Sequence, residues 1–224
     1  MVRAAAEDYL GAIYRLRMAP DVPVPLATLQ ERLHFSAMAV HEMVQKLTAQ
    51  GWIAYHPYRG VTLTATGEAL AQSVIRRHRL WERFLTDWLG VPWDEAHEIA
   101  GALEHAAPEK VTERLAQLMG EPEHCPHGGP IPPHIEARPR QPLAEVAIGQ
   151  EVELLAVEPE LPDVLRWLHQ WHIGPGARLL VQARDSNVLR IRSGSEELTM
   201  PLDFARTLLT APPEASPYPK TQEE

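Results

Sequence analysis

The chain is short of the features that place a protein in a membrane or outside the cell. Its 224 residues include one cysteine, Cys125, so no intramolecular disulfide can form. It has no uninterrupted apolar run of about 18 residues, so no transmembrane helix is expected. An apolar signal segment is also missing from the N-terminus. We therefore expect a cytoplasmic protein, and the 45% hydrophobic content is enough to form a buried core.

Positive charge is scarce in the chain as a whole but not in its first third. The net charge is −9, whereas residues 1–80 contain nine Lys or Arg and six Asp or Glu. That part carries +3, and the remaining residues carry −12. A slightly basic segment on an acidic body is compatible with local contact to DNA. An excess of three charges is common by chance, so this interpretation needs support from motifs.

The first 65 residues show the element order of a winged helix-turn-helix domain. Apolar residues recur at helical spacing in three segments, and Ser36 and Gly51 suit the start and the end of the third. Two β-like segments follow, joined by turn-forming residues 57–60. Any other small α+β domain is the alternative. The predicted helices span residues 4–18, 26–33 and 37–50, and the predicted strands span residues 52–56 and 61–64.

Beyond residue 65 the pattern predicts a helical domain, a connector and a β domain. The helical domain covers residues 66–122, and the Pro-rich connector covers residues 123–142. Residues 143–211 fit a small β-barrel, and the Pro-rich end, residues 212–224, is predicted to be disordered. The predicted helices are 66–89, 94–105, 108–119 and 162–171, and the predicted strands are 147–157, 177–183, 188–192 and 197–200.

Potential metal ligands gather in residues 76–105. His78 and Glu82 are four residues apart, and Glu104 and His105 follow His97 at spacings of seven and eight. These spacings put the side chains on one face of each helix, and an antiparallel turn would bring the two faces together. Mixed imidazole and carboxylate ligands suit first-row divalent ions. The alternative is a solvated surface strip, which a single His-x-x-x-Glu pair would not exclude.

Five motifs make the chain recognisable. They are E-D-Y-L-x-x-I-Y at 7–14, R-G-V-x-L-T-x-x-G at 59–67, R-R-H-R-L-x-E-R-F-L at 76–85, H-x-x-x-x-x-x-E-H at 97–105 and C-P-H-G-x-P-I-P at 125–132. With them, residues 4–210 resemble the diphtheria toxin repressor family, which includes iron-dependent repressors and manganese transport regulators. The resemblance implies a mainly α fold with small β parts: a winged-helix DNA-binding domain, a helical dimerisation and metal domain, and a C-terminal SH3-like barrel.

The resemblance also implies two metal sites per subunit. An ancillary site would use His78, Glu82 and His97, with Glu160 and Asp163 from the barrel, and a primary site would use Asp8, Glu104 and His105.

The chain departs from the family in the primary site. Iron-type members have Met at position 8 and Cys at position 101, whereas manganese-type members have Asp and Glu there and another Glu at position 11. This chain has Asp8, Gly101 and Gly11. Either the primary site is weak and completed by water or backbone carbonyls, or the ancillary site has become the main one. Glu7 and Glu98 lie close in sequence, but we do not assign them as ligands. A site without sulfur favours Mn(II), with Fe(II) as the alternative.

Residues 125–128, C-P-H-G, follow His124, and together these residues resemble a zinc-binding motif. Only one cysteine is present and no second cluster supports such a site. We therefore interpret the segment as a structural turn that closes the helical domain.

The predicted recognition helix begins at Ser36. Residues near its N-terminus would enter the major groove, and Arg59 at the hairpin tip would meet phosphate. No Arg or Asn pair is placed for bidentate base reading, so methyl contacts and DNA shape would contribute more. Met43 is interpreted as a packing residue. The predicted DNA-contacting residues are Ser36, Ala37, Met38, Ala39, Glu42, Lys46 and Arg59.

The sequence thus predicts a homodimeric, metal-dependent transcriptional regulator, interpreted as a repressor of metal-homeostasis genes, with Mn(II) or Fe(II) as co-regulator and a palindromic operator as partner. A metallohydrolase is a more distant alternative, and the typical H-E-x-x-H motif is absent. A third hypothesis is a winged-helix regulator that senses a small molecule. It predicts that His78→Ala and Glu104→Ala leave DNA binding unchanged.

Overall fold

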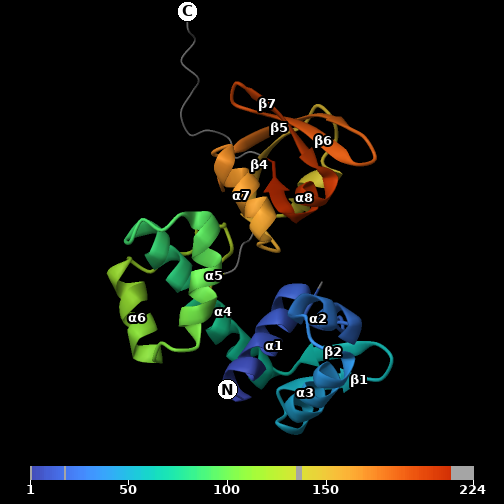
Figure 1. The fold of residues 1–224 in the computed structure, drawn as a ribbon, viewed down its shortest axis with the longest axis vertical. Helices are drawn as coiled ribbons and strands as arrows, with labels where there is room; N and C mark the ends of the chain where they lie inside the picture. Colours follow the sequence, from blue (N-terminus) through green and yellow to red (C-terminus); the bar gives the residue numbers. More distant parts are fainter. Residues whose placement is uncertain (1, 18, 135–137, 213–224) are drawn as a thin grey trace, which may run out of the picture.

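The computed structural model describes residues 2–17, 19–134 and 138–212, and it has three parts (Figure 1). An N-terminal part of helices and a hairpin contacts a helical part. A C-terminal β domain lies against the helical part, where α7 (Pro162–Gln170) contacts α5 (Trp93–Glu104). The tail expected to be disordered lies, from residue 213 on, outside the described residues.

The N-terminal part is a winged helix-turn-helix, as predicted. It consists of α1 (Val2–Leu16), α2 (Leu26–Leu33), α3 (Ala37–Ala49), β1 (Ile53–His56) and β2 (Gly60–Leu63). Helix α3 begins at Ser36, whose Oγ accepts a hydrogen bond from the backbone N of Ala39 at 3.2 Å. The apolar face of α3 packs with Tyr9, Leu10 and Ile13 of α1 in one core. The orientation of α3 is therefore tied to that of α1.

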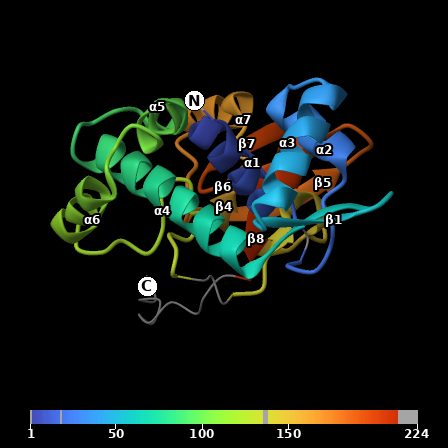
Figure 2. The same cartoon turned by 90° about the horizontal axis from the view of Figure 1, so that it is seen from below.

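Helix α4 (Ala65–Asp87) connects the winged helix to the helical part. Thr64 starts it by accepting a hydrogen bond from the backbone N of Gly67 at 3.1 Å. Figure 2 shows α4 running from the hairpin toward α5 (Trp93–Glu104) and α6 (Glu109–Leu118). Ala96 and Ala100 are fully buried, and their small side chains let α5 pack closely on α4. One helix thus joins the winged helix to the helical part.

The C-terminal part is a six-stranded antiparallel sheet in the order β3-β8-β4-β5-β6-β7 with its own buried core. Sequence periodicity predicted the central strands and α7, but it missed the elements that close the domain after Pro201. The elements are β3 (Gln141–Pro142), the 3₁₀ turn η1 (Leu143–Glu145), β4 (Glu151–Val157), α7 (Pro162–Gln170), β5 (Arg178–Arg184), β6 (Val188–Ser193), β7 (Glu196–Pro201), α8 (Leu202–Thr207) and β8 (Leu208–Ala211).

Among the described helices, none combines the length and the apolar character needed to cross a membrane.

Candidate metal centre

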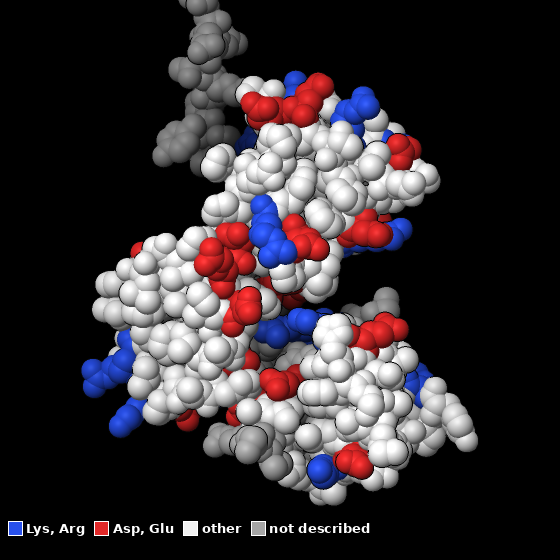
Figure 3. Space-filling model, viewed as in Figure 1, with Lys and Arg blue, Asp and Glu red and all other residues white. Residues whose placement is uncertain are grey.

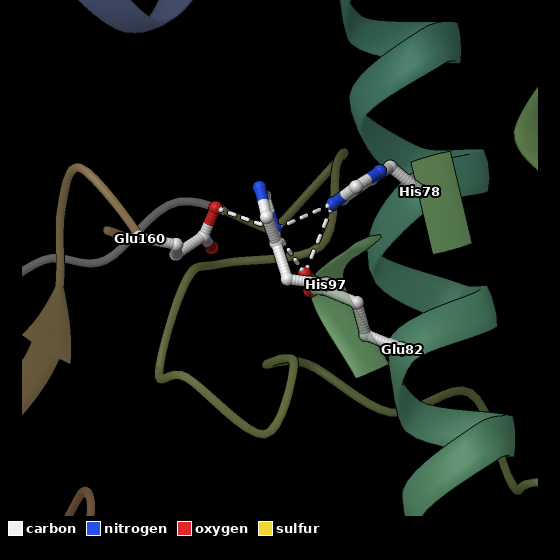
Figure 4. Close-up of side chains that lie close together, drawn as sticks. All are labelled: His78, Glu82, His97 and Glu160. Atoms are coloured by element: carbon white, nitrogen blue, oxygen red, sulfur yellow. Dashed lines mark hydrogen bonds and ion pairs between the residues drawn. The ribbon is translucent and has the colours of Figure 1, made fainter. Parts of the chain in front are cut away.

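Four predicted ligands meet inside the protein, in a cluster that we call the interior centre. Helix α4 supplies His78 and Glu82, α5 supplies His97, and the segment before α7 supplies Glu160 (Figure 4). Glu82 Oε1 lies 2.9 Å from both His78 Nε2 and His97 Nδ1. Glu160 Oε2 lies 3.2 Å from His97 Nδ1. The β domain therefore contributes a carboxylate to a site that is otherwise built by the helical part.

Burial makes this cluster suited to a cation. Glu82 is 0% exposed, and its Oε2 has no hydrogen-bond partner among the described residues. A buried carboxylate is costly unless it is paired or coordinates a metal. Two imidazoles and two carboxylates, with one oxygen left unpartnered, fit a divalent first-row ion.

The turn at residues 125–128 adds two donors that the sequence analysis did not assign. His127 is 0% exposed, and its Nδ1 lies 3.2 Å from Glu82 Oε1. Its Nε2 lies 2.7 Å from the carbonyl oxygen of Trp93, so an N–H there donates outward and Nδ1 faces the centre. Cys125 is also buried, and both residues form a possible ligand group with Glu82 and Glu160. The segment is a turn, but its side chains reach the interior centre.

Two glycines let this turn approach its neighbours. Gly128 has φ +84°, and a Cβ there would lie 1.9 Å from the carbonyl oxygen of Leu155. A Cβ on Gly129 would lie 2.8 Å from the guanidinium of Arg79. Arg79 itself donates to the carbonyl of Pro130 and lies 3.3 Å from Glu158 of the β domain. The close approach of the turn to the backbone of β4, together with the contacts of Arg79 to Pro130 and Glu158, therefore fixes the direction of the His127 side chain.

Charge in the centre is balanced between carboxylates and imidazoles. Burial disfavours the protonated form of His127, but the facing Glu82 and the Cys125 contact outweigh it and raise the pKa of His127 to about 12. Burial also lowers the pKa of His78, but the neighbouring Glu82 outweighs it and raises this pKa to about 9. Burial raises the pKa of the Cys125 thiol to about 11. A metal ion bound here must displace these protons, so metal binding will be coupled to proton release.

A second group of donors, the α1 cluster, joins the winged helix to α5. Asp8 of α1 has its Oδ1 2.9 Å from Nε2 of His105, the residue that follows α5 as its C-cap. Glu104 Oε1 lies 3.2 Å from the same nitrogen. Burial raises the pKa of Asp8, and the neighbouring His105 opposes that shift. All three predicted primary-site ligands are therefore together, with donor atoms within 4.8 Å of one another.

The structure also defines the surroundings of the two missing ligands. Gly101 has open space where a Cβ would be, whereas a Cβ on Gly11 would touch Val74 and Ile75 of α4. Glu7 lies 2.9 Å from His105 Nδ1 and 2.8 Å from Arg77. Since His105 Nε2 is the nitrogen facing Asp8, Glu7 holds the ring from the opposite side rather than replacing a missing ligand.

His78 connects the two groups. Its Nε2 faces Glu82 in the interior centre, and its Nδ1 lies 2.9 Å from Glu104 Oε2 of the α1 cluster. Asp163 joins neither group. Its carboxylate pairs with Arg166 at 2.5 Å, and its side chain is 79% exposed.

The predicted DNA-contacting residues are all exposed. Every one of the six on α3 and its cap is exposed, and Met38 is 74% exposed. Arg59 is exposed beside Tyr58, between β1 and β2. Met43, by contrast, is partly buried and packs on the core of the winged helix.

A winged helix linked through α1 and α4 to buried His and carboxylate donors defines the class of metal-dependent DNA-binding regulators. Comparison with known families agrees with this class. Residues 1–61 match the iron dependent repressor N-terminal DNA binding domain, and residues 64–133 match the iron dependent repressor metal binding and dimerisation domain. The chain therefore belongs to the iron-dependent repressor family, whose members are transcriptional repressors that bind divalent metal ions. Membership excludes the metallohydrolase alternative.

Similar proteins cover most of the chain. The iron-dependent repressor IdeR of Mycobacterium leprae is 31% identical over 218 residues, which are 90% of this chain and 94% of that protein. The diphtheria toxin repressor of Corynebacterium jeikeium is 36% identical over 126 residues, 56% of this chain and 52% of its own. A manganese-dependent transcriptional repressor solved with manganese has a TM-score of 0.85 at 30% identity, covering 92% of this chain and 99% of the other. The repressor ScaR with bound Zn²⁺ has a TM-score of 0.80 at 29% identity, with the same coverage.

Proposed function

We propose that this protein is a homodimeric, Mn(II)-dependent repressor of metal-homeostasis genes that binds a palindromic operator. Each subunit takes two divalent ions, one in the interior centre and one in the α1 cluster. The observation that carries the proposal is the 2.9 Å contact between Asp8 of the winged helix and His105 at the end of α5. It places one donor set across the boundary between the DNA-binding and the metal-binding parts.

The chain itself supplies the connection from metal to DNA. Asp8 lies on the helix whose Tyr9 and Leu10 share a core with α3, so a constraint on α1 also constrains the recognition helix. A divalent ion in the α1 cluster supplies positive charge that neutralises Asp8 and Glu104. An arrangement in which these donors are close thus becomes more populated when the ion is present. By linkage, DNA affinity rises to the extent that the ion prefers that arrangement.

Two copies are required to read a palindrome, and the helical part offers a surface for pairing. Several large apolar side chains are exposed there, and exposed apolar surface is typical of an interface. A two-fold dimer uses the same patch on both copies, which matches the symmetry of a palindrome. The exposed apolar residues of this part are Trp88, Leu89, Ile99, Val111 and Leu118.

DNA contact is proposed for α3 and the β1–β2 hairpin and not for the rest of the surface. Figure 3 shows acidic side chains gathered where the helical part meets the β domain, a face that repels phosphate. Exposed Lys46 and Arg59 provide cationic contacts on the winged helix. The exposed Ala37, Met38 and Ala39 provide methyl contacts for bases.

Mn(II) is the proposed ion because the α1 cluster offers two carboxylates and one imidazole without sulfur. Fe(II) is the second candidate, favoured by the Cys125 thiol beside the interior centre and by the iron-dependent repressors among the relatives. The two candidates differ in one measurable respect. If Fe(II) is the effector, anaerobic Fe(II) will give tight DNA binding at lower free concentration than Mn(II) does.

The test starts from an operator selected from random duplex DNA with the purified protein and Mn(II). Fluorescence anisotropy then measures DNA affinity after chelation and with Mn(II) or Fe(II) restored. We expect metal to tighten binding at least about fivefold, the lower end of typical allosteric coupling. Equal affinity with and without metal refutes the proposal, and unchanged binding by His78→Ala and Glu104→Ala would support the metal-independent alternative.

A further inference from the structure

A third group of potential metal ligands, Glu123, His124 and His134, lies outside both sites. We call it the hairpin-base cluster because it lies at the base of the loop that the antiparallel bridge between His124 and Pro130 closes. Each offers one donor atom, and these atoms lie within 4.8 Å of one another. The His124 and His134 rings are 4.7 Å apart between centroids and inclined by 74°. Two imidazoles from positions ten residues apart therefore face a common volume beside a carboxylate.

The backbone holds this cluster together without help from any ion. The backbone N of Ile131 donates to the carbonyl of Glu123 at 2.7 Å, and the N of His134 donates to the carbonyl of Ile131 at 2.9 Å. His124 and Pro130 also form an antiparallel bridge. Ile131 is 1% exposed and packs with Leu80, which anchors the segment to α4. Donors fixed in advance lose little entropy when they bind a ligand.

The cluster is separate from the interior centre although the chain passes directly from one to the other. His124 and Cys125 are consecutive, and successive side chains of extended backbone point to opposite sides. Cys125 is buried next to Glu82, whereas Glu123 is exposed and His124 and His134 are half-buried. An ion from solvent can reach the hairpin-base cluster without entering the core.

We propose that Glu123, His124 and His134 form a third cation site, selective for Zn(II) over Mn(II). Two imidazoles and one carboxylate are a common three-ligand set for zinc, with water in the remaining position. Imidazole favours zinc, copper and nickel, whereas Mn(II) prefers sites richer in oxygen. The site lies at the base of the loop, closed by the His124–Pro130 bridge, that carries Cys125 and His127. This inference does not depend on the metal that activates DNA binding.

The test is a count of bound ions per chain in the full-length protein. Equilibrium dialysis against buffered Zn(II), with metal measured by mass spectrometry, compares the unmodified chain with His134→Gln. The matched control is His41→Gln, which changes an exposed histidine on α3. We expect His134→Gln to bind one zinc ion fewer than the unmodified chain and than the control. The Mn(II) count, followed by electron paramagnetic resonance, is expected to be equal in all three proteins.

Two results overturn the inference: an unchanged zinc count in His134→Gln, or a parallel loss of zinc and Mn(II). A second variant, Glu123→Gln, guards against misfolding because that side chain is exposed. It is expected to weaken zinc binding at this site at least about tenfold, since even residues that only orient a ligand have effects of that size. Unchanged zinc affinity in Glu123→Gln also contradicts the proposed site.

Discussion

Replacing His127 with phenylalanine tests the interior centre most directly. Phenylalanine keeps an aromatic ring, somewhat larger than imidazole, beside Trp93, whose ring centroid is 5.2 Å from that of His127, but it has no nitrogen. The substitution removes the 2.7 Å contact to the Trp93 carbonyl and the 3.2 Å contact to Glu82. Its effect therefore reports these polar contacts rather than a cavity.

The expected cost in the metal-free protein follows from those two contacts. A buried carbonyl left without its donor costs about 1–3 kcal/mol. Removing one partner of a buried ion pair costs about 3–5 kcal/mol when no other partner remains, but Glu82 keeps His78 and His97 at 2.9 Å. We therefore expect a total loss of about 3 kcal/mol. For a chain of this size that lowers the melting temperature by about 6–12 °C.

The assay is thermal unfolding in chelator, followed by Mn(II) titration of the folded protein. His127→Phe is expected to melt earlier than the unmodified chain and to bind Mn(II) in the interior centre at least about tenfold more weakly. The control is His41→Gln, which should match the unmodified chain in both measurements. A melting temperature within about 2 °C of the unmodified chain, together with unchanged Mn(II) affinity, would refute the placement of His127.

Three further predictions address the other parts of the molecule. Asp8→Ala is expected to weaken the metal-dependent part of DNA binding at least about tenfold. The control Asp21→Ala, which changes an exposed aspartate, is expected to leave it unchanged. Equal DNA affinities of the two variants in the anisotropy assay would contradict the role of the α1 cluster. Arg17 donates a hydrogen bond to Glu68 at 2.8 Å, and this bond lowers the pKa of Glu68. The pair should therefore stabilise the fold by about 1 kcal/mol at pH values above about 4.3, the pKa of Glu in the unfolded chain. This contribution is lost as the pH falls through the lower pKa of Glu68 in the folded protein. Denaturant unfolding of Glu68→Gln checks this: its deficit should be present at pH 7 and shrink below about pH 4, and a deficit independent of pH would contradict it. Arg59→Ala should weaken binding about equally for all DNA sequences and reduce the salt dependence by about one ion; a loss confined to one base position would instead indicate base reading.

Periodicity in the sequence was enough to predict most of the fold. The helices of the first two parts came from apolar residues at helical spacing, and Ser36 correctly marked the start of α3. The elements after Pro201 were missed for a physical reason. Helix α8 has six residues, too few to show a period, and β8 follows it with no turn-forming residue between. Only pairing with β3 and β4 distinguishes that strand from a continuing helix.

The metal donors were predictable only where a regular element carries them. His78 and Glu82 share a face of α4 because both lie within one helix. The same spacing argument does not extend to Asp163, because α7 begins at Pro162 and Glu160 lies before the helix. His127 lies in a turn, where no period relates one side chain to the next. The nearby glycines and Arg79, which fix its direction, act through contacts distant in sequence.

The contact of His78 with both donor groups has a consequence for how the two ions bind. A neutral imidazole carries one hydrogen, on one of its two nitrogens. When Nε2 gives its lone pair to an ion in the interior centre, the hydrogen must be on Nδ1, which lies 2.9 Å from Glu104 Oε2. That oxygen belongs to the carboxylate whose Oε1 lies 3.2 Å from His105 Nε2 in the α1 cluster. Because the pKa of His78 is about 9, an ion in the interior centre would displace the proton on Nε2 of a ring that also faces Glu104. The two sites therefore share one titrating group, and the Mn(II) isotherm will differ from that of two independent sites.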